Sequence, residues 1–589
     1  MYDPKQISTI ELFNYIVKAN QKIIKNYCCN FSGYHRDLHD IVLTYSYFFT
    51  KLFSEPNELV KVWNFLLEFS QEQQALYKTI FINECHEDNA PEADKTVIIK
   101  KKDKRFTAPQ WDKYPYFSFI KQNYWLTEQL SVQIIDEVEM GEPIKKKLHF
   151  YTQQYTDMFS PSNFLLTNPE IQELTIEKKG ENLLYGLINL VHDIKQGRIS
   201  QVDEFAFEIG KNIAVTPGVV IYENELIQLI QYSPNTTNVY QIPILIIPPW
   251  INKYYILDLQ QENSFVKFLV DSGFTVCIIS WKNPVPGTDN FIFEDYVSKG
   301  ALKAIEITKD ISGAEKINVL GYCLGGTLLS VTCSILAAQK KEIINSITFL
   351  ASMVDFSDIG PMGDVINEAL VSKLERGELL KNGVMHGHDM ERAFNLIRAK
   401  DMIWKYTINN YLKGNTPPPV DVIYWTNDNT NLPAEMYIYY MRQMILENKL
   451  SRKNALRICD TPIDIGKIKA PVFVVGMKED YISPPATAFA TTELVSGPVE
   501  FILGGSGHVM GVANPPSQNK YGYYLNGRLN YGYDEWKKTA HFFEGSWWTA
   551  WSERLEKNSG NKIPAPKRPG NEKYKTIERA PGKYVKEKC

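Results

Sequence analysis

A cysteine stands at the centre of a glycine-rich pentapeptide, and residues of this type and spacing could perform nucleophilic catalysis. The pentapeptide 321–325 reads G-Y-C-L-G and matches the pattern G-x-S-x-G, with Cys323 in the place of serine. In that pattern a strand turns sharply into a helix, and glycine-sized neighbours let the two elements approach closely. The segment 326–340 has a helical composition, so its N-terminus would direct backbone N–H groups at Cys323 and favour a thiolate. A glycine-rich turn around a buried structural cysteine is the alternative interpretation.

Two later loops supply the acid and the base that a cysteine nucleophile needs. Asp480 follows the β-prone segment 472–475, and His508 follows the β-prone segment 499–503. The order nucleophile, acid, histidine is typical of α/β-hydrolases, in which all three lie on loops at the carboxyl edge of the sheet. His508 could withdraw the thiol proton, and the carboxylate could orient that histidine or act on a second substrate. These placements together favour catalysis over a structural turn.

Two other features of the site are less completely specified by the sequence. Glu479 and Asp355 compete with Asp480 for the role of the acid, and we favour Asp480. An oxyanion hole would combine the backbone N–H of Leu324 with an N–H from the loop around Trp250, which occupies the place expected for that element. The sequence does not show which residue of this loop donates.

The elements that would position these groups form an alternating series. From about residue 212 onward, β-prone segments alternate with helical ones, which predicts a parallel sheet with right-handed crossovers and helices on both faces. The fold class is therefore α/β, specifically an α/β-hydrolase fold. The alternation stops at about 352–461, and an insertion at this point predicts a cap over the strand ends where ligands bind. The expected strands are 213–215, 219–221, 242–247, 275–279, 317–320, 346–350, 472–475 and 499–503.

The length of the chain and the change from helical to alternating β-prone and helical segments predict two domains. With 589 residues the chain is too long for one ordinary core. Residues 1–205 predict a mainly helical N-terminal domain, and its aromatic cluster at 111–125 fits either a core or a surface for a partner. Residues 206–589 predict the catalytic domain, which ends in an extended, basic tail at 557–589.

The composition excludes several classes of protein. A hydrophobic content of 44%, an aromatic content of 13% and a net charge of −4 provide for packed cores and argue against disorder or a nucleic-acid-binding surface. The first residues lack the order of a signal peptide, and no apolar run reaches the roughly 18 residues of a membrane span, so we expect a cytosolic protein. The eight cysteines show no disulfide-type spacing. Neither C-x-x-C nor H-E-x-x-H occurs, so we expect no metal.

A set of further motifs is spread over most of the chain. They read D-K-R-F at 103–106, S-P-S-N-F at 160–164, T-P-G at 216–218, P-P-W-I-N-K at 248–253, S-W-K-N-P at 280–284, G-Y-C-L-G-G-T at 321–327, N-N-Y-L-K-G-N-T-P at 409–417, N-L-P at 431–433, E-D at 479–480, G-H at 507–508 and A-P-G-K-Y-V-K at 580–586. Together they resemble the motifs of polyhydroxyalkanoate synthases, specifically the class I type that works without a second subunit.

This resemblance implies a role for each matched residue. By position, Cys323 is the acyl-bearing nucleophile, His508 is the general base, and Asp480 is the carboxylate often assigned to activating the incoming hydroxyl. Trp425, in the expected cap, matches a tryptophan that the family uses near the active site. One departure is Tyr481, where histidine is usual.

A second departure from the family is Met510, which lies two residues after His508 where smaller residues are usual. A bulky side chain there would narrow the acyl pocket and exclude longer acyl chains. Methionine is flexible, however, so it could fold aside and widen the choice of substrate instead. The third alternative is that it points into the core and never meets the substrate.

The resemblance also implies an activity and a setting. The enzyme would be an acyltransferase that polymerises (R)-3-hydroxyacyl-CoA, with 3-hydroxybutyryl-CoA as the leading substrate, into polyhydroxyalkanoate through a thioester on Cys323. No cofactor is expected, because coenzyme A is part of the substrate and a product. The implied partners are the growing polyester chain, a second copy in a homodimer, and the surface and proteins of a polyester granule in the cytoplasm. The resemblance assigns residues 1–205 to dimerisation or granule association.

Two other functions fit parts of the sequence. A cysteine esterase or thioesterase of the same fold would share an acylated Cys323 but release free hydroxy acid instead of polymer. A non-catalytic granule scaffold protein would use only the aromatic N-terminal domain and the basic tail.

Overall fold

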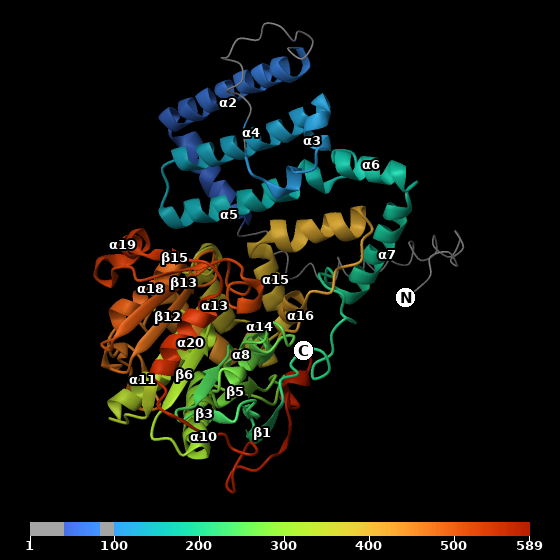
Figure 1. Cartoon of the computed structure of the whole chain (residues 1–589). Coiled ribbons are helices and arrows are strands. Elements are labelled where there is room, and N and C mark those ends of the chain that lie inside the picture. Colours follow the sequence, from blue (N-terminus) through green and yellow to red (C-terminus); the bar gives the residue numbers. More distant parts are fainter. Residues whose placement is uncertain (1–40, 83–98, 100) are drawn as a thin grey trace. The chain divides into compact units, whose positions relative to one another are not determined.

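The computed structural model describes residues 41–82, 99 and 101–589, and the chain divides into two compact units (Figure 1). The helical unit comprises the chain up to Asp203 together with Phe394–Pro418. The sheet unit comprises Glu204–Ala393 together with Pro419–Cys589. Residues 1–40 and 83–98, which the sequence assigns to the N-terminal domain, lie outside the described residues.

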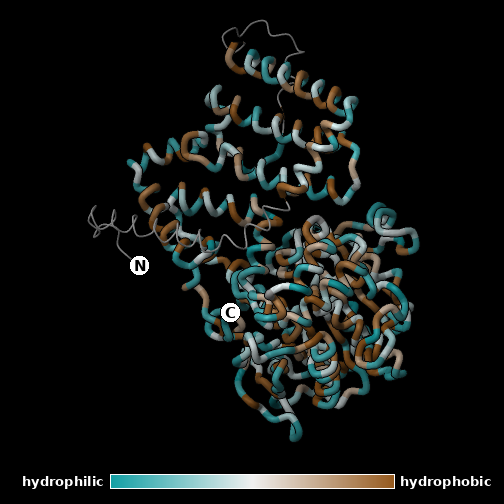
Figure 2. Tube along the Cα trace, turned by 180° about the vertical axis from the view of Figure 1, so that it is seen from behind, coloured by the Kyte–Doolittle hydropathy of each residue, from teal (hydrophilic) through white to brown (hydrophobic). Residues whose placement is uncertain are grey.

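Prolines mark the starts of several elements in the helical unit. The described elements are the helix 41–54, α2 (Pro56–Tyr77), η2 (Lys78–Ile82), η5 (Lys104–Phe106), α3 (Gln110–Lys113), α4 (Pro115–Glu137), α5 (Glu142–Met158), η6 (Pro161–Asn163), α6 (Pro169–Glu177), α7 (Glu181–Gln196), η9 (Lys400–Trp404) and η10 (Thr407–Leu412). Pro56, Pro115 and Pro169 are the first residues of their helices. Proline suits this position because its φ is already helical, and because an N–H at this position would have no acceptor within the helix. Brown and teal residues alternate along these helices in Figure 2, as in helices that bury one face.

The aromatic cluster of the helical unit forms a core. Phe106, Trp111 and Trp125 are buried, with exposed fractions of 5%, 0% and 5%. The Phe106 ring packs edge-on against both tryptophans, at centroid distances of 4.8 and 5.5 Å. Other members of the cluster, such as Tyr116, remain exposed. The buried members therefore support the interpretation of this cluster as a core.

The segment 394–418 lies within the expected cap range but is part of the helical unit. Side chains of α7 bind its backbone, since the Asn189 amide donates to the carbonyl groups of Asn410 and Asn415, both at 3.0 Å. The Tyr411 hydroxyl donates in return to Asp193 at 2.7 Å. The insertion is thus divided between the units, which the loss of strand alternation could not indicate. The observed boundary, between 203 and 204, lies two residues before the expected one.

The sheet unit is built on a mixed sheet with the order β15-β14-β13-β12-β7-β6-β4-β5-β2-β1-β17. From β5 to β13 through the centre, neighbouring strands are parallel, whereas the strands at both edges pair antiparallel. The central eight strands have the order of an α/β-hydrolase, which confirms the predicted fold class. The strands are β1 (Gly218–Glu223), β2 (Ile227–Tyr232), β4 (Ile244–Ile247), β5 (Val276–Trp281), β6 (Ile317–Tyr322), β7 (Ile344–Leu350), β12 (Val472–Met477), β13 (Val499–Gly504), β14 (Tyr523–Leu525), β15 (His541–Phe543) and β17 (Glu578–Arg579).

Two sequence expectations for the first strands are wrong. The segment 213–215 is a turn with an isolated bridge, because Ala214 has a positive φ of 55° and its N–H donates to the Asp258 carbonyl. Strand β2 was missed, since its glutamines suggest an exposed face. Gln228 and Gln231 are buried nonetheless, and their amides bind the tail through Glu578 and the N–H of Gly570.

Helices cover the sheet, and hydrophobic segments lie in the interior of this unit in Figure 2. Helix α11, which follows the central strand β6, is buried from Gly325 to Leu336 because it packs between the sheet and other elements. The helices that cover the sheet are α8 (Phe265–Asp271), α9 (Phe293–Asp295), η8 (Tyr296–Leu302), α10 (Lys303–Ser312), α11 (Leu324–Ala338), α18 (Pro485–Leu494), α19 (Gly532–Thr539) and α20 (Trp547–Lys557).

The insertion and the tail complete the sheet unit. The tail is extended, as expected, and pairs twice with earlier strands: β16 (Lys562–Pro564) with β3 (Asn238–Tyr240), and β17 with β1. No helix in the described part of the chain is long and apolar enough to cross a membrane. The insertion contains α12 (Met362–Val365), α13 (Glu368–Arg376), α14 (Glu378–Asn382), β8 (Val384–Met385), α15 (Gly387–Ile397), α16 (Asp421–Thr426), β9 (Leu432–Pro433), α17 (Ala434–Tyr439), η11 (Tyr440–Leu446), β10 (Arg457–Ile458) and β11 (Thr461–Pro462). The remaining short elements are η7 (Tyr254–Leu257), η12 (Ile465–Lys467), η13 (Pro516–Gln518), η14 (Leu529–Tyr531) and η15 (Tyr584–Lys586).

Gly186→Ala tests how the segment 394–418 is held. A Cβ atom at 186 would lie 1.8 Å from the Tyr411 carbonyl oxygen, so η10 would have to move away from α7. We expect a loss of about 1–3 kcal/mol in the free energy of unfolding of the helical unit, and faster proteolysis within 394–418. Denaturant titration and limited proteolysis measure these effects. Gly141→Ala is the control, because its Cβ would meet only Pro143 Cδ at 3.8 Å. Equal stability of the two variants would contradict this account of the segment.

Candidate active site

Cys323 lies at a strained turn between β6 and α11. Strand β6 ends at Tyr322 and helix α11 begins at Leu324, so Cys323 alone makes the turn. Its φ of 53° and ψ of −123° fall in a region that residues with a side chain rarely adopt. The Cys323 N–H donates to the Leu350 carbonyl at 2.9 Å, which anchors the turn to the neighbouring strand. The sharp turn expected from the pentapeptide pattern is therefore present.

Three glycines allow the close packing around this turn. A Cβ atom on Gly321 would lie 2.4 Å from the Cα of Gly326, and one on Gly325 would lie 2.0 Å from the Ile247 carbonyl oxygen. A Cβ atom on Gly326 would lie 2.2 Å from Ser352 Oγ. Each approach excludes any larger residue, so the start of α11 is pressed against the end of β4. The sequence pattern pointed to 321 and 325, whereas 326 falls outside it.

His508 and Asp480 form a buried pair. His508 Nδ1 lies 2.7 Å from Asp480 Oδ2, and the side chains are 5% and 0% exposed. A carboxylate accepts at this distance, so Nδ1 donates and Nε2 is the ring nitrogen that can exchange a proton with another group. Cys323 lies near enough to the same imidazole to raise the pKa of His508. The structure thus brings together the three residues that the sequence proposed as a triad.

The backbone fixes the carboxylate of Asp480. Its Oδ1 atom accepts from the N–H groups of Ile482 and Ser483 at 2.9 and 2.8 Å. The two competing acids are placed differently, since Glu479 is exposed and the Asp355 carboxylate accepts from Asn448 at 2.8 Å. Asp480 is therefore the acid that meets the histidine.

The surroundings of His508 favour its charged form. Burial alone would lower the pKa of His508, but the Asp480 carboxylate and the Cys323 sulfur outweigh this effect and raise the pKa well above its usual value. The Tyr322 ring stacks on the imidazole at a centroid distance of 5.6 Å. An imidazolium held in this way would stabilise a thiolate beside it.

The two expected oxyanion donors lie on adjoining elements. Leu324 is the first residue of α11, and the N–H groups of a first helical turn have no acceptor within the helix. The Trp250 side chain is buried against Trp281, Phe293 and Tyr296, so any contribution of this residue comes from its backbone. The Gly325 packing on the end of β4 brings the two backbone segments together. The oxyanion role of both residues stays a prediction.

Trp425 and Met510, the expected pocket residues, differ in their surroundings. Trp425 is 4% exposed, and its Nε1 donates to the Lys253 carbonyl at 2.6 Å, so it contacts the loop after β4. Met510 is 43% exposed and does not lie in the core. A contact of either residue with substrate stays a prediction.

Tyr440 is a site residue that the sequence did not reveal. It is buried in η11 of the insertion, with its ring 6.0 Å from that of Trp250. Burial raises the pKa of Tyr440, and the nearby Cys323 raises it further, so the two groups are neighbours. The insertion has no motif around this tyrosine, and only the folded chain brings it to the elbow.

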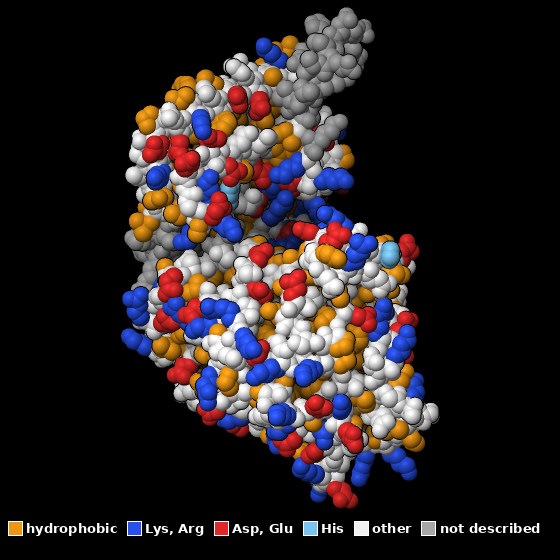
Figure 3. Space-filling model, turned by 90° about the vertical axis from the view of Figure 1, so that its left-hand side faces the viewer, with side chains coloured by type: hydrophobic (Ala, Val, Ile, Leu, Met, Phe, Trp, Pro, Cys, Tyr) orange, Lys and Arg blue, Asp and Glu red, His pale blue; other side chains and the backbone are white. Residues whose placement is uncertain are grey.

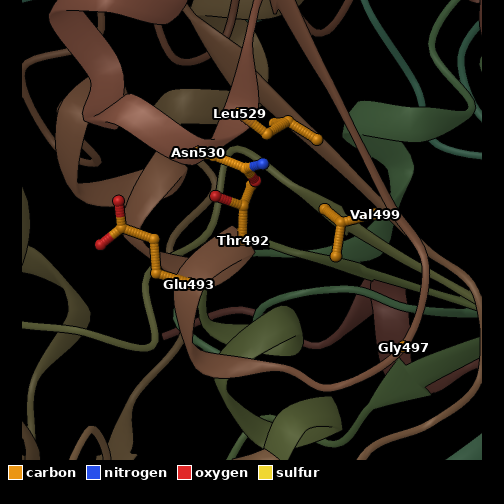
Figure 4. A pocket seen from close by; sticks show the side chains of 6 residues that line it. All are labelled: Thr492, Glu493, Gly497, Val499, Leu529 and Asn530. Carbon is orange, nitrogen blue, oxygen red and sulfur yellow. The ribbon is translucent and has the colours of Figure 1, made fainter.

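A surface pocket of about 370 Å³ lies elsewhere in the sheet unit (Figure 4). Its lining includes Val499, the first residue of β13, whereas His508 follows the last residue of that strand. The pocket and the triad thus belong to opposite ends of β13. The lining residues are Thr492, Glu493, Gly497, Val499, Leu529 and Asn530, none of which is a nucleophile with a neighbouring base.

Comparison with known proteins finds relatives of this chain by sequence. A family model described as Poly-beta-hydroxybutyrate polymerase (PhaC) N-terminus matches residues 102–269. The chain is 41% identical over 491 residues to the Poly(3-hydroxyalkanoate) polymerase subunit PhaC of Cupriavidus necator, which covers 83% of each chain. It is 38% identical over 493 residues to the protein of the same name from Rhizobium meliloti, covering 83% of this chain and 80% of the relative. Among solved structures, an alpha/beta hydrolase fold protein from Chitinophaga pinensis is 16% identical, with a TM-score of 0.29, over 51% of this chain and 93% of that chain.

Asp480→Asn tests the electrostatics of the pair. The substitution removes the negative charge that raises the pKa of His508, so the imidazolium should lose its proton at a lower pH and stabilise the thiolate less. We expect alkylation of Cys323 by iodoacetamide at pH 7 to slow about tenfold, and to recover as the pH rises. Peptide mass spectrometry identifies the modified cysteine. Glu479→Gln is the matched control, because this neighbouring carboxylate is exposed. A rate equal to that of the control would show that Asp480 does not act on the thiol through His508.

Proposed function

This chain belongs to the poly(3-hydroxyalkanoate) polymerase family, and we propose that it polymerises (R)-3-hydroxyacyl-CoA through a thioester on Cys323, with release of coenzyme A. The observation that carries the proposal is the position of Cys323 at the strained elbow, beside the His508–Asp480 pair. Family membership establishes the class of reaction. The geometry supports the assignment of the steps to residues.

Acylation is the first proposed step. His508 Nε2 takes the proton of Cys323, and the thiolate attacks the thioester carbonyl of the substrate. The N–H of Leu324, at the positive end of α11, stabilises the negative charge on the carbonyl oxygen. The carbon–sulfur bond to coenzyme A then breaks, and the leaving thiolate takes the proton from His508. The acyl group moves from one thioester to another, so little free energy is lost.

Chain extension is the second proposed step. The hydroxyl of a 3-hydroxyacyl unit loses its proton to His508 and attacks the thioester on Cys323. The new bond is an oxygen ester, and the Cys323 thiolate is released and protonated again. The free energy stored in the thioester drives this step. A serine ester at this position would be a lower-energy intermediate and would leave less driving force.

We propose that Asp480 acts through His508 in both steps. The Asp480 side chain has no exposed area, one oxygen binds His508, and the other binds two backbone N–H groups. A carboxylate held in this way has no free oxygen for an incoming hydroxyl. The buried pair therefore supports the orienting role, one of the two roles that the sequence left open.

The finer features of the reaction rest on the sequence motifs and are proposals. We propose that the enzyme is of class I, works without a second type of subunit, and prefers 3-hydroxybutyryl-CoA. The partly exposed Met510, two residues beyond the catalytic histidine, would influence the accepted acyl length from the rim of the site. We also propose that the cap insertion excludes water, since hydrolysis of the thioester competes with ester formation.

We further propose that the helical unit attaches the enzyme to polyester granules in the cytoplasm and supports a homodimer. Hydrophobic side chains lie at the surface of this unit in Figure 3. On α2 they recur at three- and four-residue intervals, which places them along one exposed stripe. The stripe, with exposed fractions from 41% to 61%, consists of Leu59, Val60, Trp63, Leu66 and Leu67. A polyester surface is apolar and would cover such a stripe.

Cys323→Ala tests the proposed function directly. We expect purified enzyme to release coenzyme A from 3-hydroxybutyryl-CoA and to form insoluble polymer, and the variant to lose at least about 10³-fold in rate because no acyl-enzyme can form. Cys459→Ala, which alters a cysteine outside the elbow, should retain the wild-type rate. Free 3-hydroxybutyrate as the main wild-type product would establish the hydrolase instead. Unchanged coenzyme A release in Cys323→Ala would exclude both the polymerase and the hydrolase, and would favour the non-catalytic granule scaffold protein.

The α2 stripe generates a separate prediction. In Val60→Glu/Trp63→Glu, two charges must be desolvated on contact with polyester, so we expect the fraction of enzyme bound to granules to fall at least about tenfold. Coenzyme A release by the free enzyme should change little. Gln71→Glu/Gln74→Glu adds the same charge to exposed positions of α2 and serves as the control. Co-sedimentation with granules measures binding, and equal binding of both variants would exclude the stripe as the attachment surface.

A further inference from the structure

Three carbonyl groups of the loop 248–253 accept hydrogen bonds from buried side-chain donors that lie outside the loop. The pairs are Trp281 Nε1 to the Pro248 carbonyl at 2.9 Å, Thr430 Oγ1 to the Trp250 carbonyl at 2.8 Å, and Trp425 Nε1 to the Lys253 carbonyl at 2.6 Å. The three donors are 6%, 3% and 4% exposed, so water competes little for these bonds. One donor comes from strand β5, whereas Trp425 and Thr430 come from the insertion. The insertion therefore sets the conformation of a loop that belongs to the sheet.

The bond from Thr430 also fixes an N–H group. The C=O of Trp250 and the N–H of Ile251 belong to one planar trans peptide unit, in which they point in opposite directions. Because the carbonyl points at Thr430, the Ile251 N–H points away from Thr430. Pro248 and Pro249 have no N–H, so the loop has few donors to offer near the end of β4. The direction of this peptide unit thus decides where one of these donors, the Ile251 N–H, points.

Further contacts hold the insertion against the same loop. Asn252 and Asn429 form an antiparallel bridge. Lys253 Nζ lies 2.9 Å from Asp428 Oδ1, and these side chains are 2% and 4% exposed. The Tyr255 hydroxyl donates to the other oxygen of Asp428 at 2.9 Å. An ion pair at this depth is costly to break, so the position of Thr430 relative to the loop is rigidly determined.

We propose that Thr430 is a positioning residue for acyl transfer, which orients the peptide unit between Trp250 and Ile251 so that the Ile251 N–H becomes the second oxyanion donor. The inference rests on the proposed function, because it requires an oxyanion on the acyl group carried by Cys323. In this proposal Thr430 acts through the loop, by its bond to the Trp250 carbonyl. The insertion thereby contributes to the chemistry as well as covering it.

Thr430→Val removes the hydroxyl and keeps the shape of the side chain. We expect kcat for coenzyme A release from 3-hydroxybutyryl-CoA to fall about 10- to 100-fold, with KM within about threefold, because the lost donor acts on the transition state. Thr430→Ser restores the hydroxyl and should recover most of the rate. Thr426→Val is the matched control, since the Thr426 hydroxyl donates within its own helix to the Ile423 carbonyl at 2.8 Å.

Alkylation of Cys323 by iodoacetamide separates positioning from general damage to the fold. This reaction uses the thiolate but forms no oxyanion, so Thr430→Val should alkylate within about twofold of wild type. Turnover equal to that of Thr426→Val, or alkylation lost in parallel with turnover, would overturn the proposal. If Thr430→Val does not fold, Thr430→Ala, which also lacks the hydroxyl, must show the same loss of kcat with normal alkylation. If the proposed function were wrong, the wild type would form no polymer. Polymer from the wild type and normal alkylation of Thr430→Val therefore separate a failure of this proposal from a failure of the proposed function.

Discussion

The close approach of helix α11 to the end of strand β4 determines the geometry of the whole site. Gly325 lies against the Ile247 carbonyl with no room for a Cβ atom, and this contact forces Cys323 into a backbone conformation that its side chain disfavours. The strain is maintained because the helix is buried and cannot retreat. In return, the thiol projects at the N-terminus of a helix, beside the loop that follows β4. The proposed nucleophile and the proposed backbone donors are thus positioned by one packing contact.

The electrostatics of the His508–Asp480 pair are the second determinant of the site. The pair of His508 and Asp480 is removed from water, and a buried charge is stable only when every lone pair and proton has a partner. The backbone N–H groups of Ile482 and Ser483 satisfy the oxygen of Asp480 that the histidine leaves. The imidazole is consequently the member of the pair that offers an atom, Nε2, to the reacting groups. In the proposed cycle, the proton transfers of both steps pass through it.

The sequence predicted the parts of this protein that local chemistry dictates, and it failed where distant contacts decide. The elbow, the order of the triad and the central strands follow from glycine spacing and from apolar runs, which depend on neighbouring residues. Strand β2 was missed because its buried glutamines are satisfied by the tail, more than 300 residues away in the chain. The segment 394–418 joins the helical unit through contacts of its backbone with α7, which leave no pattern in its own side chains. Tyr440 and Thr430 escaped notice for the same reason, since their roles depend on where the insertion folds.

The pairing of the tail with early strands has a consequence for the order of folding. Strand β17 pairs with β1, where Arg579 lies opposite Val219, and the Lys253 ammonium donates to the carbonyl of Glu587 at 2.6 Å, across a sequence separation of 334 residues. Contacts between residues so distant in the chain form slowly, because a long stretch of chain must be ordered before they reward its ordering. The central strands pair with partners that lie closer in the chain. The edge of the sheet and the environment of Lys253 are therefore expected to be completed late in folding, after the elbow has formed.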